Sequence, residues 1–249
     1  MYSYLVCLLT ICQVSNSFSL QIDSSTIHNK TIGISQAKLQ VDTSRLRRSY
    51  NEQSSSESND NIILPEVLKW KKNVILENNL QFDPLACGPG LHIFNKNKHL
   101  RQSSTYSVFR SCRVTNVGWN NGIHYWTMKI FERGAGGNMF IGIVTEQNNM
   151  SAATYVGQTE HGYGFSVSDN NRYHSGNYHM LATSSSIVNG DTMGLLLDLG
   201  ARTMTIFKNG LIMGTIFGEL QEKSSTKYYP AVSFYETQQW VSFIDTTRS

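Results

Sequence analysis

Cysteine, proline and charge are all scarce in this chain of 249 residues. Its four cysteines are too few for a disulfide scaffold or for a pair of four-ligand zinc sites. Charged residues make up 16% of the chain and leave a formal net charge of +3, which excludes a polybasic arm or an acidic tail as the main feature. A hydrophobic fraction of 40%, with 11% aromatic residues, is enough for a sizeable core. We therefore expect a largely globular protein that binds no nucleic acid.

The sequence also lacks the motifs that mark common catalytic sites. It contains no Gly-x-Ser-x-Gly elbow, no His-Glu-x-x-His pair, no phosphate-binding loop and no Rossmann fingerprint. The glycine-rich stretch 134–137 is not followed by Lys-Ser/Thr, so it is typical of a hairpin tip. His174 and His179 lie close in sequence, but no cysteine or clear carboxylate completes a metal-ligand set with them. We predict no enzymatic activity, no cofactor and no metal.

The amino terminus resembles an export signal. Residues 4–12 (YLVCLLTIC) are apolar apart from Thr10, yet nine residues are far short of the roughly 20 that cross a bilayer. They fit the apolar core of a secretory signal, and Ser15 and Ser17 supply the small residues that precede a cleavage site. We predict a signal peptide over residues 1–17, a secreted protein and no stable membrane insertion. The alternatives are an unstructured or mis-started N-terminus and a cytoplasmic protein.

Secretion would change how several other residues are interpreted. Cys87 and Cys112 would enter an oxidising compartment, where they either pair or remain two small buried hydrophobic residues. Asn29 and Asn149 each begin an Asn-x-Ser/Thr triplet and are candidate glycosylation sites. The basic cluster that ends at Arg48 is either a processing site or a solvated charge run.

Residues 18–61 show little periodicity and include the polar run SSSESNDN, which predicts a disordered linker or pro-segment. Residues 62–79 favour a short helix, because Pro65 suits a first helical turn and the apolar residues fall on one face. The residues on that face are Leu64, Val67, Leu68, Trp70, Val74 and Ile75.

Beyond residue 80 short apolar runs alternate with turn residues. Residues 123–130 alternate, with Trp126 and Met128 on one face and Tyr125 and Thr127 on the other, so we expect one face of this strand to be buried. Asn209-Gly210 and Asn121-Gly122 can each supply the two positive φ angles of a tight type I′ turn. Many short strands without helix-length periodic segments predict an all-β fold, an antiparallel sandwich or barrel.

The strand blocks resemble the SPRY (B30.2-like) family in unbroken order over residues 80–246. Phe82-Asp83-Pro84 is similar to the motif that opens the longer form of the domain. The other matching blocks are 122–130 (GIHYWTMKI), 139–144 (MFIGIV), 162–165 (GYGF), 190–199 (GDTMGLLLDL), 206–210 (IFKNG) and 229–233 (YPAVS). The resemblance implies a two-sheet antiparallel β-sandwich with Trp126 between the sheets.

The resemblance also implies a function: members of the family bind a protein or peptide through loops at one end of the sandwich. By sequence order these loops are 102–108, 117–121, 146–155, 168–178 and 235–239. We expect a monomer whose partner contacts come from aromatic, Arg and Asn side chains there, with Trp119 the strongest candidate because it lies in a polar turn. The candidates are Tyr106, Trp119, Asn120, Tyr155, Arg172, Tyr173, Tyr178 and Tyr235.

Three settings remain open for such a domain. A secreted single-domain SPRY protein is similar to the effectors of plant-parasitic nematodes and to SPRY toxins of venoms. An intracellular adaptor and a secreted carbohydrate-binding sandwich are the alternatives. Ala152 stands where the SOCS-box members that bind Asn-rich peptides carry a pocket tyrosine, so that specificity is not implied here.

Overall fold

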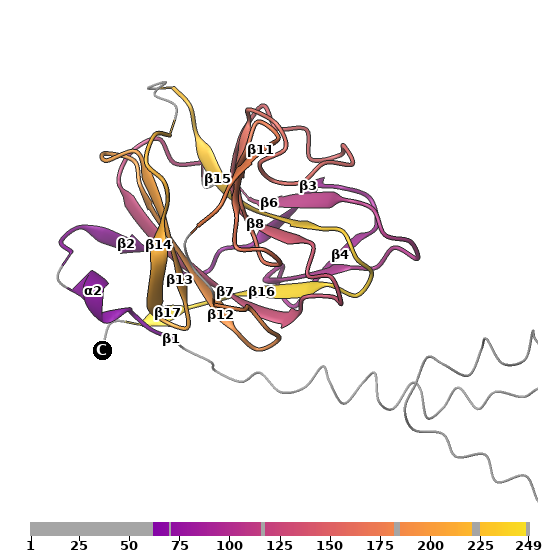
Figure 1. Ribbon diagram of the computed structural model, residues 1–249, viewed down its shortest axis with the longest axis horizontal. Coiled ribbons are helices and arrows are strands. Elements are labelled where there is room, and N and C mark those ends of the chain that lie inside the picture. The colour runs from indigo at the N-terminus through magenta and orange to yellow at the C-terminus, as the bar shows by residue number, and fades with distance from the viewer. Residues whose placement is uncertain (1–61, 70, 116–117, 182–184, 221–224, 248–249) are drawn as a thin grey trace, which may run out of the picture. The chain divides into compact units, whose positions relative to one another are not determined.

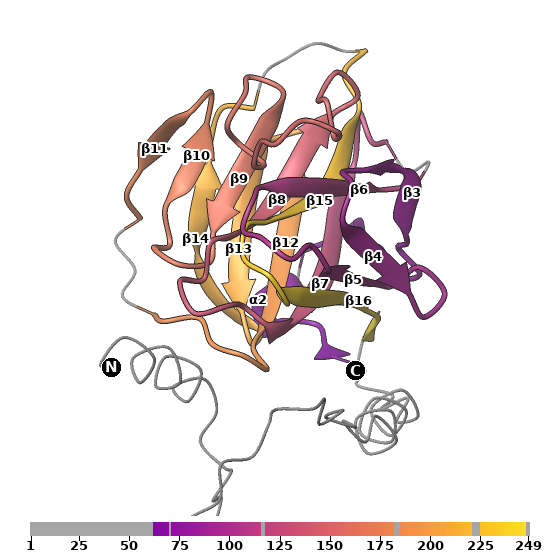
Figure 2. The same cartoon turned by 90° about the vertical axis from the view of Figure 1, so that its right-hand side faces the viewer.

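The computed structural model describes residues 62–69, 71–115, 118–181, 185–220 and 225–247. The predicted signal peptide, the linker over residues 18–61, Asn29, Arg48 and Trp70 lie outside this part of the chain. The described residues form two antiparallel sheets that lie face to face as two layers (Figures 1 and 2). The predicted all-β sandwich is confirmed.

The first sheet has seven strands in the order β11-β10-β9-β8-β15-β6-β3, and neighbouring strands are antiparallel. Several neighbours in this order, such as β6 and β15, are far apart in the sequence. Between them the chain crosses to the other sheet and returns. The strands are β3 (Phe82–Cys87), β6 (Arg110–Val114), β8 (Met139–Thr145), β9 (Gly162–Ser166), β10 (Arg172–His174), β11 (Asn177–His179) and β15 (Tyr228–Phe234).

The second sheet follows the order β14-β13-β12-β7-β16-β5-β4, and a further strand, β2 (Val74–Leu76), pairs with β7 in parallel. A separate two-stranded ladder joins β1 (Ile62–Ile63) to β17 (Thr246–Thr247). The remaining strands are β4 (Leu91–Phe94), β5 (His99–Gln102), β7 (Ile123–Glu132), β12 (Thr192–Asp198), β13 (Thr203–Lys208), β14 (Leu211–Phe217) and β16 (Trp240–Ile244).

The main core lies between the two sheets. Trp126 is 1% exposed there and packs with alternate residues of both sheets, such as Met128 on β7 and Ile141 on β8. Alternation along a strand sends every second side chain inward, so these bulky residues fill the space between the layers. The expected position of Trp126 is confirmed.

Residues 62–79, called the strap below, differ from the expected helix. Helix α2 (Glu66–Lys69) is a single turn, and the residues after it form β2 instead. The predicted short helix is present, but it is only one turn long and does not continue into residues 74–76. Val67 and Ile75 from the expected apolar face are exposed. β2 forms because the first residues of β7 extend beyond β16 and leave an open sheet position, with Val74 pairing with Ile123.

The strap gives the molecule a second, smaller core. Leu64, Leu68 and Val74 pack on the outer face of the second sheet against Tyr125, Leu196 and Phe207. β7 is consequently buried on both faces, whereas the alternation of its sequence predicted one buried face. Figure 1 shows α2 and β2 beside the second sheet, on the side away from β8 and β15.

The two Asn-Gly turns adopt different backbone conformations. Asn209 and Gly210 have φ angles of 50° and 78°, as a type I′ hairpin between β13 and β14 requires. At the other site Gly122 has a positive φ of 92° and Asn121 does not, so the type I′ prediction there was wrong. Gly122 instead ends the loop that leads into β7. No helix among the described residues is both long and apolar enough to cross a bilayer.

Candidate interaction site

The outer face of the first sheet is crossed by the long loop between β8 and β9. This segment, residues 146–161, is called the crossing loop. The Ser111 hydroxyl donates to the carbonyl of Thr154 at 2.7 Å, and the Val156 N–H donates to the Ser233 hydroxyl oxygen at 2.8 Å. Ser111 and Ser233 are register partners on β6 and β15, and their hydroxyls are buried 2.8 Å apart. The sheet itself therefore anchors the loop.

Glycines in the sheet allow this close approach. Gly142 and Gly164 are partners on β8 and β9, in the middle of the face that the crossing loop covers. A Cβ atom on Gly164 would collide with the backbone carbonyl oxygen of Val156. The glycines thus remove side chains where the loop backbone must lie against the strands.

Six aromatic rings form a connected cluster beside the anchored loop, called the aromatic face below. Tyr155 of the crossing loop stacks on Phe140 with ring centroids 4.4 Å apart. Phe109 lies 5.0 Å from Tyr155 and 4.8 Å from Tyr235. Tyr173 lies 5.1 Å from Phe140. The members are Phe109, Phe140, Tyr155, Tyr173, Tyr178 and Tyr235.

The β10–β11 hairpin positions one end of this cluster. Tyr173 faces Gly164 on one side and Tyr178 on the other, so both tyrosines lie on the outer face. The Tyr173 hydroxyl donates to Asp169 at 2.8 Å. Burial, followed by this hydrogen bond and the carboxylate charge, raises the pKa of Tyr173 to about 12. Tyr178 is 61% exposed, so the cluster has a solvent-facing edge.

A buried glutamine fixes the other end. The side-chain oxygen of Gln239 accepts hydrogen bonds from the N–H groups of Tyr235 and Glu236, and its amide donates to the Arg133 carbonyl at 2.6 Å. Gln239 is fully buried, so these bonds hold the β15–β16 turn rigidly. Tyr106 is 64% exposed on the adjoining β5–β6 loop, where the Val108 N–H donates to the Tyr235 carbonyl.

The structure brings five of the eight predicted residues to one region and separates three from it. Trp119 pairs with Tyr228 at the start of β15, whereas Tyr235 follows the end of that strand. Seven strand residues span roughly 20 Å, so Trp119 and the exposed Asn120 lie at the opposite end of the sandwich. Arg172 alternates with Tyr173 and points inward, where its guanidinium donates to the Ile216 carbonyl.

Trp119 also has a clear structural role, contrary to the reason for its selection. Its N–H and carbonyl both bond to Tyr228, at 3.0 and 2.8 Å. Its ring stacks on His124 with centroids 4.3 Å apart and planes 8° apart, and it packs against Trp126. The argument that a tryptophan in this turn lacks a structural reason was wrong.

Three residues that position the site were missed from the sequence. Phe109 precedes β6 and lies outside the motif blocks. Phe140 sits inside the uniformly apolar run 139–144, which hides its outward orientation. The strand alternation could have found it, since Gly142 and Phe140 share a face opposite Ile141. Gln239 carried no local signal, because its partners are 106 residues away or in the same turn.

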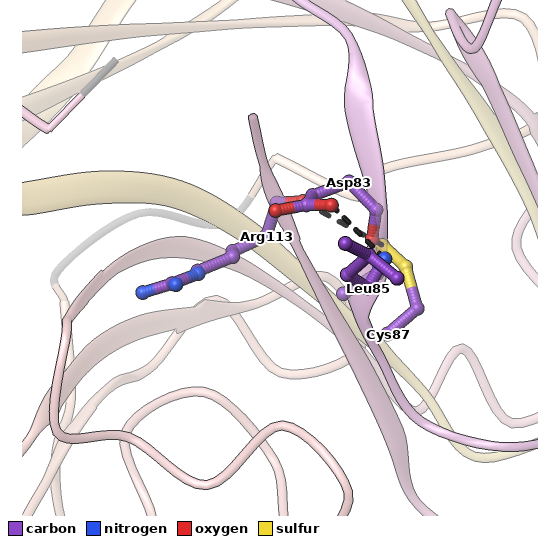
Figure 3. Close-up of a disulfide and its surroundings, with 5 residues drawn as sticks. Asp83, Leu85, Cys87 and Arg113 are labelled. Carbon is purple, nitrogen blue, oxygen red and sulfur yellow. Dashed lines mark hydrogen bonds between the residues drawn. A yellow bond between two sulfur atoms is a disulfide. The ribbon is translucent and has the colours of Figure 1, made fainter. Parts of the chain in front are cut away.

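The sequence left open whether Cys87 and Cys112 pair, and in the structure they do. Cys87 on β3 and Cys112 on β6 are register partners and form a disulfide (Figure 3). β3 is an edge strand whose pairing with β6 is interrupted by a register shift between Phe82 and Cys87. The disulfide therefore ties an irregular edge strand to the sheet. Leu85, beside it, is 98% exposed.

The comparisons with known proteins agree with the fold. Residues 123–247, half of the chain, match the SPRY domain model. The chain therefore belongs to the SPRY domain family, whose domains are generally protein-interaction modules. The observed sandwich begins before the matched residues, because β3 to β6 belong to the same two sheets.

Two kinds of relative have this domain as part of their chain. F-box/SPRY domain-containing protein 1 of Drosophila virilis is 29% identical over 47% of this chain and 48% of its own length. Human SPRY domain-containing SOCS box protein 1 is 26% identical over 47% of this chain and 45% of its own length. The chain thus spans about half the length of these relatives.

Solved structures give the same fold. The SPRY domain of human HERC1 matches with a TM-score of 0.55 at 22% identity, over 66% of this chain and 97% of that domain. Stonustoxin matches with a TM-score of 0.54 at 18% identity, over 69% of this chain and 27% of the toxin chain. At these identities the likeness establishes the architecture alone.

The aromatic face presents apolar rings together with tyrosine hydroxyl groups. Burial raises the pKa of Tyr155, so this phenol remains neutral and can donate a hydrogen bond. Within the described part of the chain, no group of three or more His, Cys, Asp and Glu side chains could hold a metal ion.

Proposed function

We propose that this protein is a non-catalytic, monomeric interaction module that binds a protein or peptide through the aromatic face and Tyr106. The observation that carries the proposal is a cluster of six rings beside loops that the sheet anchors. Aromatic side chains dominate binding hot spots, because each buries a large area at little cost in conformational entropy. Phe109 and Phe140 form the floor of this surface, and the tyrosines supply hydroxyl groups at its rim.

The test compares variants of the full-length chain used as bait. Tyr178→Ala changes a ring that is 61% exposed, so we expect an unchanged fold. Tyr155→Ala removes the ring that joins the two ends of the cluster. Each should weaken capture of a given partner by about 2 kcal/mol, or about 30-fold in Kd.

A matched control is Leu211→Ala, which removes an apolar side chain that is 75% exposed on β14 of the other sheet. Partners bound by the wild-type chain and by this control, but lost by both tyrosine variants, would support the aromatic face. Equal retention by all four proteins would refute it. A fall in thermal stability that matches the loss of binding would assign Tyr155 to the core.

We further propose that residues 1–17 direct secretion, that residues 18–61 are a flexible linker or pro-segment, and that residues 80–246 form the binding domain. The disulfide between Cys87 and Cys112 supports this, because disulfides persist mainly in oxidising compartments. Asn149 is exposed in a turn of the crossing loop, as an acceptor of a glycan would be. An effector-like or toxin-like setting is compatible with this organisation.

The second candidate is an intracellular adaptor, which the F-box and SOCS-box relatives favour. Fusion of residues 1–20 to a reporter separates the two. Export of the reporter, with a mass loss that matches cleavage after Ser17, supports secretion. Retention of the reporter in the cytoplasm refutes it and leaves the adaptor.

A further inference from the structure

β11 is the terminal strand of the first sheet, so it has a strand on one side only. Figure 2 shows it at the outer edge of that sheet. All three residues of β11 are exposed, and Met180, which follows it, is 81% exposed. An open strand edge offers backbone N–H and carbonyl groups to another extended chain.

The β10–β11 hairpin determines which backbone groups face the open side. Residues 175–176 form a two-residue turn with φ angles of 52° and 74°, and His174 pairs with Asn177. In such a hairpin the pair beside the turn exchanges both hydrogen bonds, and the next pair, Tyr173 and Tyr178, exchanges none. The N–H and the carbonyl of Tyr178 therefore point away from β10.

Met180 adds a second outward donor. Arg172 and His179 are again a hydrogen-bonded pair, so the His179 carbonyl points towards β10. A trans peptide directs its N–H opposite to its carbonyl, and the described residues contain no cis peptide, so the Met180 N–H points outward. No backbone hydrogen bond joins Met180 to another described residue. The open side thus presents a donor and an acceptor at Tyr178 and a donor at Met180.

Two other edge strands have features that hinder pairing with a further chain. β3 contains Pro84 and a register shift, and β14 pairs with β13 through two register shifts. β11 contains no proline and no lysine, and its pairing with β10 is regular. These protective features therefore do not block its open side.

We propose that the partner contributes an extended peptide segment, which adds to the first sheet as a strand beside β11. This inference rests on the proposed function, because Tyr178 belongs both to the open edge and to the aromatic face. Alternate side chains of an added strand lie beside Tyr178 on the outer face, as cross-strand neighbours do. The segment that fits is one with apolar or aromatic residues at every second position.

The shortness of β11 favours a peptide over a second copy of this chain. Two copies paired through this edge would share only β11 and Met180, and so short a pairing is marginal in water. A peptide can pair with the edge and also lay its side chains against Tyr178 and Tyr173. Backbone hydrogen bonds then supply part of the affinity and the rings supply the rest.

Selection of a peptide on the full-length chain tests the proposal. The probe is a phage-displayed library of linear peptides of about 12 residues, roughly twice the length of a typical strand. The tightest binder is synthesised and methylated at one backbone nitrogen at a time. We expect sensitive positions, each weakening binding by about tenfold, to alternate with tolerant ones. Uniform sensitivity, uniform tolerance or the absence of any selected binder would count against an added strand.

Met180→Pro removes the outward N–H, and Met180→Ala is its matched control because it removes the side chain and keeps that N–H. The proline variant should bind the selected peptide about tenfold more weakly than the alanine variant, with both melting like the wild-type chain. Equal binding by the two variants would overturn the proposal. A dimer of the chain alone that is lost in Met180→Pro would assign the edge to a second copy and would also overturn it.

Amide exchange of the wild-type chain, followed by NMR, gives a readout that needs no variant. Binding of the peptide should protect the amides of Tyr178 and Met180, whereas those of Asn177 and His179 are already bonded to β10. Weaker binding in Tyr178→Ala and Tyr155→Ala without this protection would support the aromatic face and refute the added strand. Protection of these amides with unchanged binding in both tyrosine variants would support the added strand and refute the aromatic face.

Discussion

Substitution of Leu68 by alanine tests whether the strap is an integral part of the fold. Leu68 is 2% exposed in the small core on the outer face of the second sheet. The change removes three carbon atoms, worth about 0.8 kcal/mol each, and leaves a cavity beside Tyr125 and Phe207. We expect the free energy of unfolding to fall by about 2 to 3 kcal/mol, near the lower end for buried leucines because this core is small and peripheral.

The neighbouring Val67 provides the control, because it lies on the same helical turn and is 54% exposed. Val67→Ala should change stability by less than about 0.5 kcal/mol. Urea denaturation followed by tryptophan fluorescence measures both variants against the wild-type chain. If Leu68→Ala and Val67→Ala were equally mild, the strap would not be docked as described and the second core would have to be abandoned.

Three further predictions concern the sandwich itself. Replacing both Cys87 and Cys112 by serine should lower the free energy of unfolding by about 3 kcal/mol, as expected for a loop closed over a separation of 25 residues, and non-reducing peptide mapping should find the linked pair in the wild-type chain. Trp126→Ala should cost about 3 to 5 kcal/mol in urea denaturation, because a 1% exposed ring leaves the main core; a loss under about 1 kcal/mol would contradict its position. Spectrophotometric titration should show a phenol that ionises near pH 12 and is missing from Tyr173→Phe. Because this pKa is raised on folding, its contribution to stability is complete below pH 10 and is lost as the pH rises towards 12.

The sandwich could be predicted because its sequence signals are local. Alternation in β7, the Asn209-Gly210 turn and the ordered motif blocks each specify a strand or hairpin without knowledge of its partners. The position of Trp126 between the sheets was implied by the family resemblance. The order of the strands within each sheet depends on pairings far apart in the chain, and the sequence did not predict it.

The strap could not be predicted because its secondary structure is determined by what it docks against. Leu64, Leu68 and Val74 fit a helical period, and no local feature argues for a strand after residue 73. The open position beside the first residues of β7 decides the outcome, because it offers backbone partners to residues 74–76. A tertiary pairing thus overrides a weak local preference.

The candidate site also has one part that the sequence predicted and another that it did not. Tyr155, Tyr173, Tyr178 and Tyr235 were identified by residue type and loop position, and the structure gathers them into one cluster. Residue type could not reveal which end of the sandwich a loop occupies. Trp119 was selected as a polar-turn aromatic, yet its partners Tyr228 and His124 come from other segments of the chain.

The two outer faces of the sandwich are covered in different ways, and this difference bears on where a partner can bind. The strap covers part of the second sheet with Leu64, Leu68 and Val74, whose side chains are buried there. On the first sheet, the crossing loop contacts the strands through its backbone and through small residues at Ser111, Gly164 and Ser233. The Tyr155 ring of this loop stacks on Phe140 of β8 and contacts the neighbouring rings Phe109 and Tyr173. Hydrogen bonds to the sheet fix the loop, so the binding that we propose for the aromatic face would need little further ordering of the backbone.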